Sequence, residues 1–444
     1  MVRGAKRQTW WAGSILLLAA CTACKSTGGP AAHSQAGPVA PVSTPVQVAV
    51  YAGVGNSLHV YGMDTKTGEL TPRQAVADLA GVVQYVAVHP AGTSLYVACS
   101  ETPAPKDRPP ATAVYAFAID RATGAIAQIG EPLARLPRAI HATVDNSGRY
   151  LLLAHNMTES ATVLQLKPDG GLGEPVKQPE EPEHLGFLAH QIRVDPSNKW
   201  AIVPVRGDEE KVQGDGKQKK IEPAKPGHLV VFAFDDGVLT KRHAIDFPSH
   251  LGPRHIDFHP TKPLFYASLE RGNRILTYKN VDGVVTELFG TTTLSDPTLA
   301  FPDQRAGPIQ VHPSGRWVYV ANRNTHVCSP KTPCEGRSGP GENDVAVFSL
   351  DSATGEPKLV AHVDTHGFEP RTMTIDPTQH FLVVANQKEV SPPDATAPDK
   401  TVKVSPNLSV FRIGDDGGLS YVRSYDVTGG EAWWVGSVAL PGHP

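Results

Sequence analysis

Four arginines stand at the ends of strand-like segments, at Arg206, Arg254, Arg323 and Arg371. The planar guanidinium group binds carboxylate and phosphate groups through two parallel hydrogen bonds. Two groups that can exchange protons, His190 and Glu270, occupy comparable positions. If these side chains converge, the arginines require an anion to offset their repulsion, and His190 and Glu270 form a natural pair for acid–base catalysis. The residue types therefore predict an anion-binding site that can do acid–base chemistry.

These residues recur at fixed distances from a repeated dipeptide, usually X-Pro, which we call the anchor. The anchors begin at His89, Asp145 (followed by Asn rather than Pro), Asp195, His259, His312 and Asp376. Five residues before them lie Gln84, Ile140, His190, Arg254, Gly307 and Arg371, and eleven residues after them lie Ser100, Asn156, Arg206, Glu270, Arg323 and Gln387. The first set begins one strand and the second set ends the next, so both are predicted to reach one face of the fold. For Ser100, Asn156 and Gln387, the general preference for polar residues at strand ends is an equally good explanation.

A polar turn built on Gly follows a strand-like run seven times, at 64–70, 120–124, 169–172, 235–239, 282–283, 351–355 and 415–419. Each anchor is followed by a run such as 150–154 or 317–321, which is apolar on both faces as in a strand packed between two layers. One repeat therefore comprises four antiparallel strands. Seven repeats predict an all-β fold, a seven-bladed β-propeller.

Long segments rich in Pro, Gly and charge interrupt the repeats between the second and third strands, at 101–112, 207–227, 324–344 and 388–406. Loops of this length are usually functional or disordered. The strand-like segment 432–438 is expected to join the start of the domain in a shared blade, which removes the open edge of the sheet.

The N-terminus indicates export. Basic residues at 3, 6 and 7 precede an apolar stretch from 10 to 20, which is too short for a permanent membrane span. The stretch ends in Leu-Ala-Ala-Cys and resembles a bacterial lipobox, in which Cys21 would be lipidated; an ordinary cleaved signal peptide is the alternative. We therefore expect a lipoprotein signal peptide over 1–21, a flexible linker over 22–46 and the propeller over 47–444, membrane-anchored outside the cytoplasm.

Cysteine use and net charge limit the other possibilities. Cys328 and Cys334 flank a five-residue loop and could form a disulfide in an oxidising compartment, whereas Cys99 falls in a strand pattern and is expected to be buried. These thiols offer too few ligands for a zinc site, and we expect no metal and no cofactor. The net charge of −3 shows no footprint of nucleic-acid binding. We expect a monomer, and the arginines favour a small anionic molecule as its partner.

Segment 251–260, Leu-Gly-Pro-Arg-His-Ile-Asp-Phe-His-Pro, contains the pattern G-P-R-H-x-x-F-H-P. With this motif the chain resembles the seven-bladed lactonase family, which includes bacterial 6-phosphogluconolactonase and fungal carboxy-muconate lactonizing enzymes. Segments 314–323 and 369–387 are similar to later blades of that family, and the resemblance extends over residues 47–438.

The resemblance implies an active site of one His, two Arg and one Glu. The first Arg of the family lies sixteen residues before its Glu, as Arg254 does before Glu270, and the other two positions correspond to His190 and Arg323. We expect substrate contacts from the neighbouring side chains His255, Arg206, Arg371, Gln387 and Asn156. Leu269 departs from the Asn that the family usually carries, and an exported protein does not meet cytoplasmic 6-phosphogluconate, so the substrate carries over less well than the fold.

The resemblance implies a hydrolase that opens a sugar or carboxylated lactone without a metal, and its expected partner is a small anionic lactone or carbohydrate acid. Glu270 or His190 would be the general base, while Arg254 and Arg323 would bind the anionic group and stabilise the oxyanion. The alternative is a lipoprotein propeller that holds a ligand or a protein without catalysis, because propellers serve both roles. A six-bladed, calcium-dependent lactonase is disfavoured by the sevenfold repeat and the arginines.

Overall fold

The computed structural model describes residues 47–103, 110–158, 160–179, 185–213, 220–299, 301–328, 339–394, 396–397 and 400–440. The described chain is almost entirely β-structure, apart from a short 3-10 turn, Pro297–Leu299. Nothing helical in this part has the length and apolar character to span a bilayer. The predicted signal peptide and linker, with Cys21, lie outside the described residues, as does Cys334.

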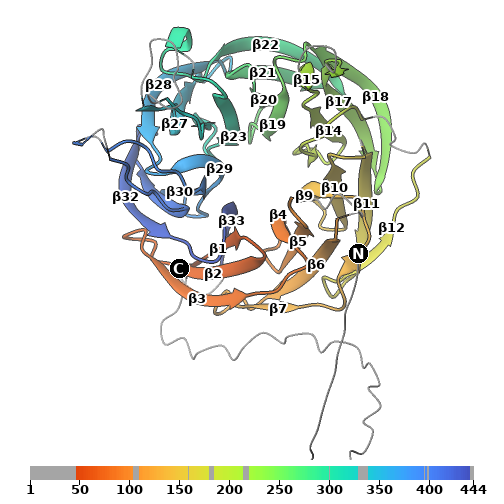
Figure 1. Ribbon diagram of the computed structural model, residues 1–444. Coiled ribbons are helices and arrows are strands. Elements are labelled where there is room, and N and C mark those ends of the chain that lie inside the picture. Colours follow the sequence, from red (N-terminus) through yellow and green to blue (C-terminus); the bar gives the residue numbers. More distant parts are fainter. Residues whose placement is uncertain are drawn as a thin grey trace, which may run out of the picture. The chain divides into compact units, whose positions relative to one another are not determined.

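Seven sheets of antiparallel strands form a ring, which confirms the predicted seven-bladed propeller (Figure 1). From the inner to the outer strand, blade 1 contains β33 (Ala432–Ala439), β1 (Val48–Val54), β2 (Ser57–Met63) and β3 (Leu70–Val76). Blade 2 contains β4 (Val82–Val88), β5 (Ser94–Ser100), β6 (Thr112–Ile119) and a split outer strand, β7 (Ile126–Gln128) with β8 (Leu133–Ala134). Blade 3 contains β9 (Ala139–Val144), β10 (Tyr150–His155), β11 (Ser160–Leu166) and β12 (Leu172–Pro175).

Blade 4 contains β13 (Arg193–Val194), β14 (Trp200–Val205), β17 (Gly227–Asp235) and β18 (Val238–Phe247). Blade 5 contains β19 (Pro253–Phe258), β20 (Leu264–Leu269), β21 (Arg274–Val281) and β22 (Val284–Thr292). Blade 6 contains β23 (Arg305–Val311), β24 (Trp317–Arg323), β27 (Asp344–Leu350) and β28 (Pro357–Asp364). Blade 7 contains β29 (Phe368–Ile375), β30 (Phe381–Lys388), β31 (Asn407–Ile413) and β32 (Leu419–Asp426).

The ring closes where the two ends of the domain meet. β33 pairs antiparallel with β1, from Val48 opposite Ala439 to Val54 opposite Ala432. The C-terminal strand thus supplies the inner strand of the blade that the N-terminal strands complete (Figure 1). The expected shared blade is confirmed, and both terminal strands are paired within one sheet.

The hydrophobic core lies between the blades. Each of the seven interfaces between neighbouring blades contains one cluster of buried apolar side chains. Tyr51 and Trp434 of blade 1, for example, pack with Val83 and Phe117 of blade 2. Every residue of β5, β10 and β20 is buried, because these second strands have a neighbouring blade on both faces.

The seven Gly turns join the third and fourth strands, and each packs on the second strand of the preceding blade. Gly283 in blade 5 has φ +82°, and a Cβ atom there would lie 2.3 Å from the ring of Trp200 in blade 4. A tyrosine completes several of these contacts, as where the Tyr266 hydroxyl donates to the Gly355 carbonyl at 2.9 Å. The sequence repeat is thus a repeated contact between blades, and only Gly fits it without strain.

The anchors lie on the same face as the Gly turns, which we call the turn face. The Nε2 atom of His89 lies 3.1 Å from the Gly148 carbonyl of the next blade, and His259 makes the same contact with Gly315. The loops between second and third strands open on the opposite face, which we call the loop face, and two of them carry short hairpins, β15 (Lys211–Gln213) with β16 (Lys220–Glu222) and β25 (Val327–Cys328) with β26 (Gly339–Pro340).

The contact at Gly283 generates a prediction about stability. Gly283→Ala should cost about 1–2 kcal/mol for the left-handed backbone and a further ~1–3 kcal/mol for the clash with Trp200. Gly130→Ala is the matched control, because Gly130 has φ +62° but nothing within 4 Å of the added Cβ atom. Urea unfolding measures the free energy of unfolding of both variants. Equal losses of that free energy would show that the contact between the blades contributes nothing to stability.

Candidate functional site

Glu270 is the centre of the charged residues on the loop face. It follows β20 directly, and its backbone N–H donates to the Gly252 carbonyl at 2.7 Å. The Oε1 atom lies 3.2 Å from Arg206 Nη1, 3.1 Å from Arg305 Nη1 and 3.2 Å from Arg323 Nη2. The Oε2 atom lies 3.1 Å from Arg254 Nε. The side chain of Glu270 is only 1% exposed, so a buried carboxylate holds guanidinium groups from blades 4, 5 and 6 together. We call these five residues the Glu270 cluster.

Burial alone would raise the pKa of the Glu270 carboxyl group, but the four arginines outweigh it and hold that pKa well below its usual range. Glu270 is therefore a carboxylate throughout the physiological pH range. Its affinity for a proton is low, and all its ion pairs would be lost on protonation. It is well placed to orient arginines and poorly suited to accept a proton from water.

Three buried histidines lie beside the cluster. The His190 and His255 rings are 5.1 Å apart in an edge-to-face arrangement, and the His255 and His141 rings are 6.2 Å apart. His255 Nδ1 lies 3.3 Å from Arg254 Nη1, which joins the histidines to the cluster. Burial lowers the pKa of His190 well below its usual value, and Arg254, Arg206, Arg371 and Arg323 lower it further. His190 is thus a neutral imidazole near pH 7, and its Nδ1 atom has no hydrogen-bond partner among the described residues.

Two arginines on the loop face have no carboxylate partner within the described ion pairs. Arg371 stacks over the Trp433 ring, with its guanidinium carbon 4.5 Å from the ring centre. Arg138 donates to Ser100 Oγ at 3.2 Å and to Gln84 Oε1 at 3.1 Å. Burial and Arg323 lower the pKa of Arg371 to about 10, and Arg138 contributes to that lowering. Positive charge that is paired in this way only with neutral groups can attract an anion.

β-Bulges aim the side chains of the inner strands at this site. The register of β19 on β20 shifts between Pro253 and His255, which leaves Arg254 as the extra residue. Corresponding shifts in other blades leave Gln84, Ile140, Gly307 with Pro308, and Arg371 as extra residues. A bulge turns a side chain away from the regular alternation of a strand, so Arg254 and Arg371 can reach the loop face.

His190 and Arg206 are held by irregular backbone rather than by a regular ladder. The His190 N–H donates to the Pro204 carbonyl at 2.9 Å, and the Arg206 N–H donates to the Leu188 carbonyl at 3.1 Å. These bonds place His190 at the start of blade 4 beside the end of its second strand, as the anchor spacing predicts.

Of the predicted site residues, Arg206, Arg254, Glu270 and Arg323 are in direct contact, and His190, His255 and Arg371 adjoin them. Gln387 Nε2 donates to Glu431 Oε2 at 2.7 Å rather than to a residue of the cluster. Asn156 is half-buried, and its Oδ1 atom has no hydrogen-bond partner among the described residues. Cys99 is buried as expected, and Cys328 is buried in β25, but its predicted disulfide to Cys334 remains a prediction.

Three charged residues of the site were missed at the level of sequence: Arg138, Arg305 and Glu369. Arg305 binds Glu270, and Glu369 forms a close ion pair with Arg323. All three lie seven residues before an anchor, which is two residues before the positions from which the sequence analysis predicted the site. They share a spacing from the anchors and lie at the start of the inner strands, so this second row was a signal available in the sequence.

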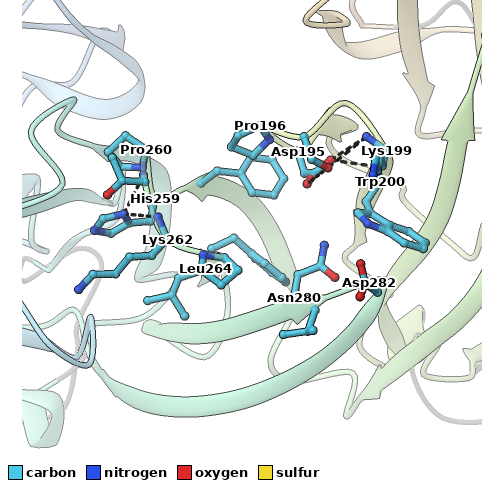
Figure 2. Close-up of a pocket in the computed structure, with 16 residues that line it drawn as sticks. Asp195, Pro196, Lys199, Trp200, His259, Pro260, Lys262, Leu264, Asn280 and Asp282 are labelled. Carbon is cyan, nitrogen blue, oxygen red and sulfur yellow. Dashed lines mark hydrogen bonds between the residues drawn. The ribbon is translucent and has the colours of Figure 1, made fainter.

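The other cavities are built differently. A groove of about 530 Å³ on the turn face lies between blades 4 and 5, and Figure 2 shows Asp195, Trp200, His259 and Asp282 on its walls. Its polar groups already serve the turns, since Asp195 Oδ1 accepts the Trp200 N–H at 2.9 Å and His259 Nδ1 accepts the Lys262 N–H at 3.1 Å. A smaller cavity of about 160 Å³ in the central channel is bordered by His255. The buried arginines that surround Glu270 lie on the loop face instead.

The family model described as "Lactonase, 7-bladed beta-propeller" matches residues 45–213 and 224–391. The chain belongs to this lactonase family. It is similar to the 6-phosphogluconolactonase of Bacillus subtilis (strain 168), with 28% identity over 339 residues that cover 76% of this chain and 86% of that protein. The protein of that name from Pectobacterium carotovorum is 25% identical over 394 residues, covering 87% and 98% of the two chains.

A periplasmic gluconolactonase from Pseudomonas aeruginosa has a similar structure, with a TM-score of 0.67, 18% identity and coverage of 89% of this lactonase-family chain and 99% of the other. At that identity the likeness supports the fold alone. Membership of the family supports the lactone hydrolase class and disfavours the alternative of a binding propeller without catalysis. It leaves the roles of individual residues to be argued from geometry.

The Glu270 cluster generates a second prediction. Glu270→Gln leaves four guanidinium groups around a neutral amide, and breaking a buried ion pair costs about 3–5 kcal/mol. We expect a lower unfolding temperature, partly restored by inorganic phosphate, which would bind the excess positive charge. Glu389→Gln, which removes an exposed carboxylate, is the control. If phosphate raised the unfolding temperature by the same amount in wild type and in both variants, the cluster would not attract anions.

Proposed function

We propose that this protein hydrolyses sugar lactones that carry an anionic group, with His190 as the general base on the loop face. The observation that carries the proposal is a neutral, buried imidazole whose pKa is lowered by nearby Arg371, an arginine that has no carboxylate partner among the described ion pairs. A negatively charged substrate would supply the missing counter-charge. The names of the relatives from Bacillus and Pectobacterium support a phosphorylated or related aldonolactone as the substrate class.

In this mechanism His190 accepts a proton from water as the oxygen of that water attacks the lactone carbonyl. The carbonyl oxygen becomes an oxyanion that Arg254 stabilises, because its guanidinium group is buried and fixed by Glu270. The ring C–O bond then breaks, and the leaving alkoxide takes the proton from His190. The product is a hydroxy acid, which releases its proton to solvent near neutral pH.

Glu270 acts here as a positioning residue. Its four ion pairs orient Arg206, Arg254, Arg305 and Arg323, and its low pKa keeps it ionised during turnover. His190 is the better base of the two candidates that the sequence offers, because its neutral form can accept a proton without the loss of an ion pair. No metal is required by this scheme.

We also propose that the domain works outside the cytoplasm, attached to a membrane through a lipid on Cys21. The lipobox-like sequence before Cys21 supports this location, as does the likeness to a periplasmic gluconolactonase. Such a location favours anionic sugar lactones from outside the cell over cytoplasmic intermediates.

The direct test is a pH-stat assay of the full chain on glucono-1,5-lactone, its 6-phosphate and a carboxylated lactone. We expect acid release above the spontaneous rate, and His190→Gln should lower kcat by about 10²-fold or more, the usual contribution of a general base. His228→Gln, in an exposed pair with Asp246, is the control. Acid release at only the spontaneous rate on all three lactones would overturn the proposal.

The pKa of His190 also predicts the pH profile. Because burial and the arginines lower that pKa below the usual imidazole value of 6.5, the base is neutral above it. The acidic limb of the kcat/KM profile should therefore lie below pH 6.5, and rates should be level from there to neutrality. A limb at or above pH 6.5 would exclude a buried His190 as the base.

Arg371 should control the preference for charged substrates. Arg371→Gln is expected to raise KM for the 6-phosphate about tenfold or more while kcat and the kinetics on neutral glucono-1,5-lactone change little. Lys241→Gln on the exposed outer strand β18 is the matched control. If both lactones lose activity to the same extent, Arg371 does not bind the anionic group.

A further inference from the structure

A second group of titratable side chains lies on blade 6, outside the Glu270 cluster. Glu342 precedes β27, Asp344 begins it, and His362 lies in the neighbouring strand β28 (Figure 1). One ligand atom from each residue lies within 4.8 Å of the other two. His362 Nδ1 is 3.0 Å from Asp344 Oδ2. This is a mixed set of one imidazole and two carboxylates, and no sequence motif predicts it.

Blade 6 places a carboxylate opposite another carboxylate. Asp344 pairs directly across the strands with Asp364. At the corresponding pair, blade 4 has His228 opposite Asp246, and blade 7 has Asn407 opposite Asp426. Like charges directly opposite one another destabilise a sheet. Blade 6 thus carries an unfavourable pair where two other blades do not.

The charge of this group is only partly balanced. In the described ranges, the ion pairs of Glu342, Asp344 and Asp364 are limited to the contact between Asp344 and His362. Neutral donors orient the carboxylates instead. Ser295 Oγ donates to Glu342 at 2.6 Å, and Asn322 Nδ2 donates to Asp344 at 2.9 Å. The oxygen atoms are therefore held in place without a matching positive charge.

Blade 7 shows how the same place is built without charge. There Asn407 replaces Asp344, Ser409 replaces Ala346 and Ser424 replaces His362. The hydroxyl groups of Ser409 and Ser424 bond to each other at 2.9 Å, and Ser409 also bonds to Asn407 at 2.9 Å. The groups of this network are uncharged and bond to one another, so the network has no need of an ion.

In blade 6 the equivalent network is open. His362 Nε2 and Thr293 Oγ1 are buried and have no hydrogen-bond partner among the described residues, and Thr293 is 0% exposed. The equivalent Thr365 of blade 7 donates to the Asn343 carbonyl at 2.8 Å. A cavity of about 530 Å³, bordered by Asp344, His362 and Asp364, adjoins the group and can supply water.

We propose that Glu342, Asp344 and His362 bind a zinc ion. Zn²⁺ accepts imidazole nitrogen together with carboxylate oxygen, whereas Ca²⁺ and Mg²⁺ prefer sets made of oxygen alone. The remaining coordination position faces the cavity and takes water or Asp364. Two positive charges would offset the carboxylates that blade 6 brings together.

The site adjoins the lactonase site through one residue. Asn343, between two of the ligands, accepts the Glu369 N–H at 2.9 Å and the Asn324 N–H at 2.9 Å. Glu369 in turn pairs with Arg323 of the Glu270 cluster. Zinc is therefore expected to rigidify the segment that positions Arg323 and to have no part in the chemistry.

The test uses the tag-free full chain after treatment with chelator, titrated with ZnCl₂ in a calorimeter. We expect one zinc ion per chain and a higher unfolding temperature with zinc. Asp344→Asn, which copies Asn407 of blade 7, and His362→Gln should each weaken binding about tenfold or more. His228→Gln is the control, because it removes a His–Asp pair of similar geometry from blade 4.

Failure to bind zinc at micromolar concentration would overturn the proposal. So would unchanged affinity in both ligand variants, or an equal loss in His228→Gln, which would indicate adventitious binding to surface histidines. Tighter binding of Ca²⁺ that does not depend on His362 would replace zinc by an oxygen-bound ion. These readouts are binding and thermal stability, so they are independent of lactone hydrolysis.

Discussion

Closure of the ring is the constraint on which the site depends. The guanidinium groups of the Glu270 cluster come from three blades and repel one another, so they stay together only if the blades cannot separate. The pairing of β33 with β1 and the buried apolar cluster at every interface provide that rigidity. Buried ion pairs are weak evidence for stability, because desolvation offsets much of their attraction. Here the ring supplies the stability, and the ion pairs determine where the arginines point.

The fold was predictable because its repeat is visible twice, in the Gly turns and in the anchors. Both mark contacts between neighbouring blades, such as Gly283 on Trp200 and His89 on Gly148, and such contacts must recur once per blade. Much of the site followed from the same spacing, including the approach of Arg206, Arg254 and Arg323 to Glu270. The prediction missed Arg305, Glu369 and Arg138, because it considered only the residues five positions before each anchor. Gln387 was placed on the correct face, but its partner, Glu431, comes from a connection that spacing does not constrain.

The two candidate bases show why residue type alone did not assign roles. In the sequence Glu270 and His190 are both suitable proton acceptors. Their pKa values are lowered for different reasons, Glu270 by four ion pairs and His190 chiefly by burial. The ion pairs keep Glu270 negatively charged, and burial keeps His190 neutral, with a nitrogen lone pair that can accept a proton. These two effects can be distinguished only in the structure, because the sequence does not show which arginines face the Glu270 carboxylate.

The bulged residue that most of the inner strands carry has a wider consequence. It makes no regular pair with the second strand, so its side chain is released from the alternation that the ladder imposes on its neighbours. The residues at this one position differ greatly in size and charge, yet all five blades interrupt the ladder there; the residues are Gln84, Ile140, Arg254, Gly307 and Arg371. Because a bulged residue has no partner on the second strand, its side chain can differ from blade to blade while the ladder on either side of it is kept. The bulges are thus the positions at which this propeller varies its loop face within one architecture.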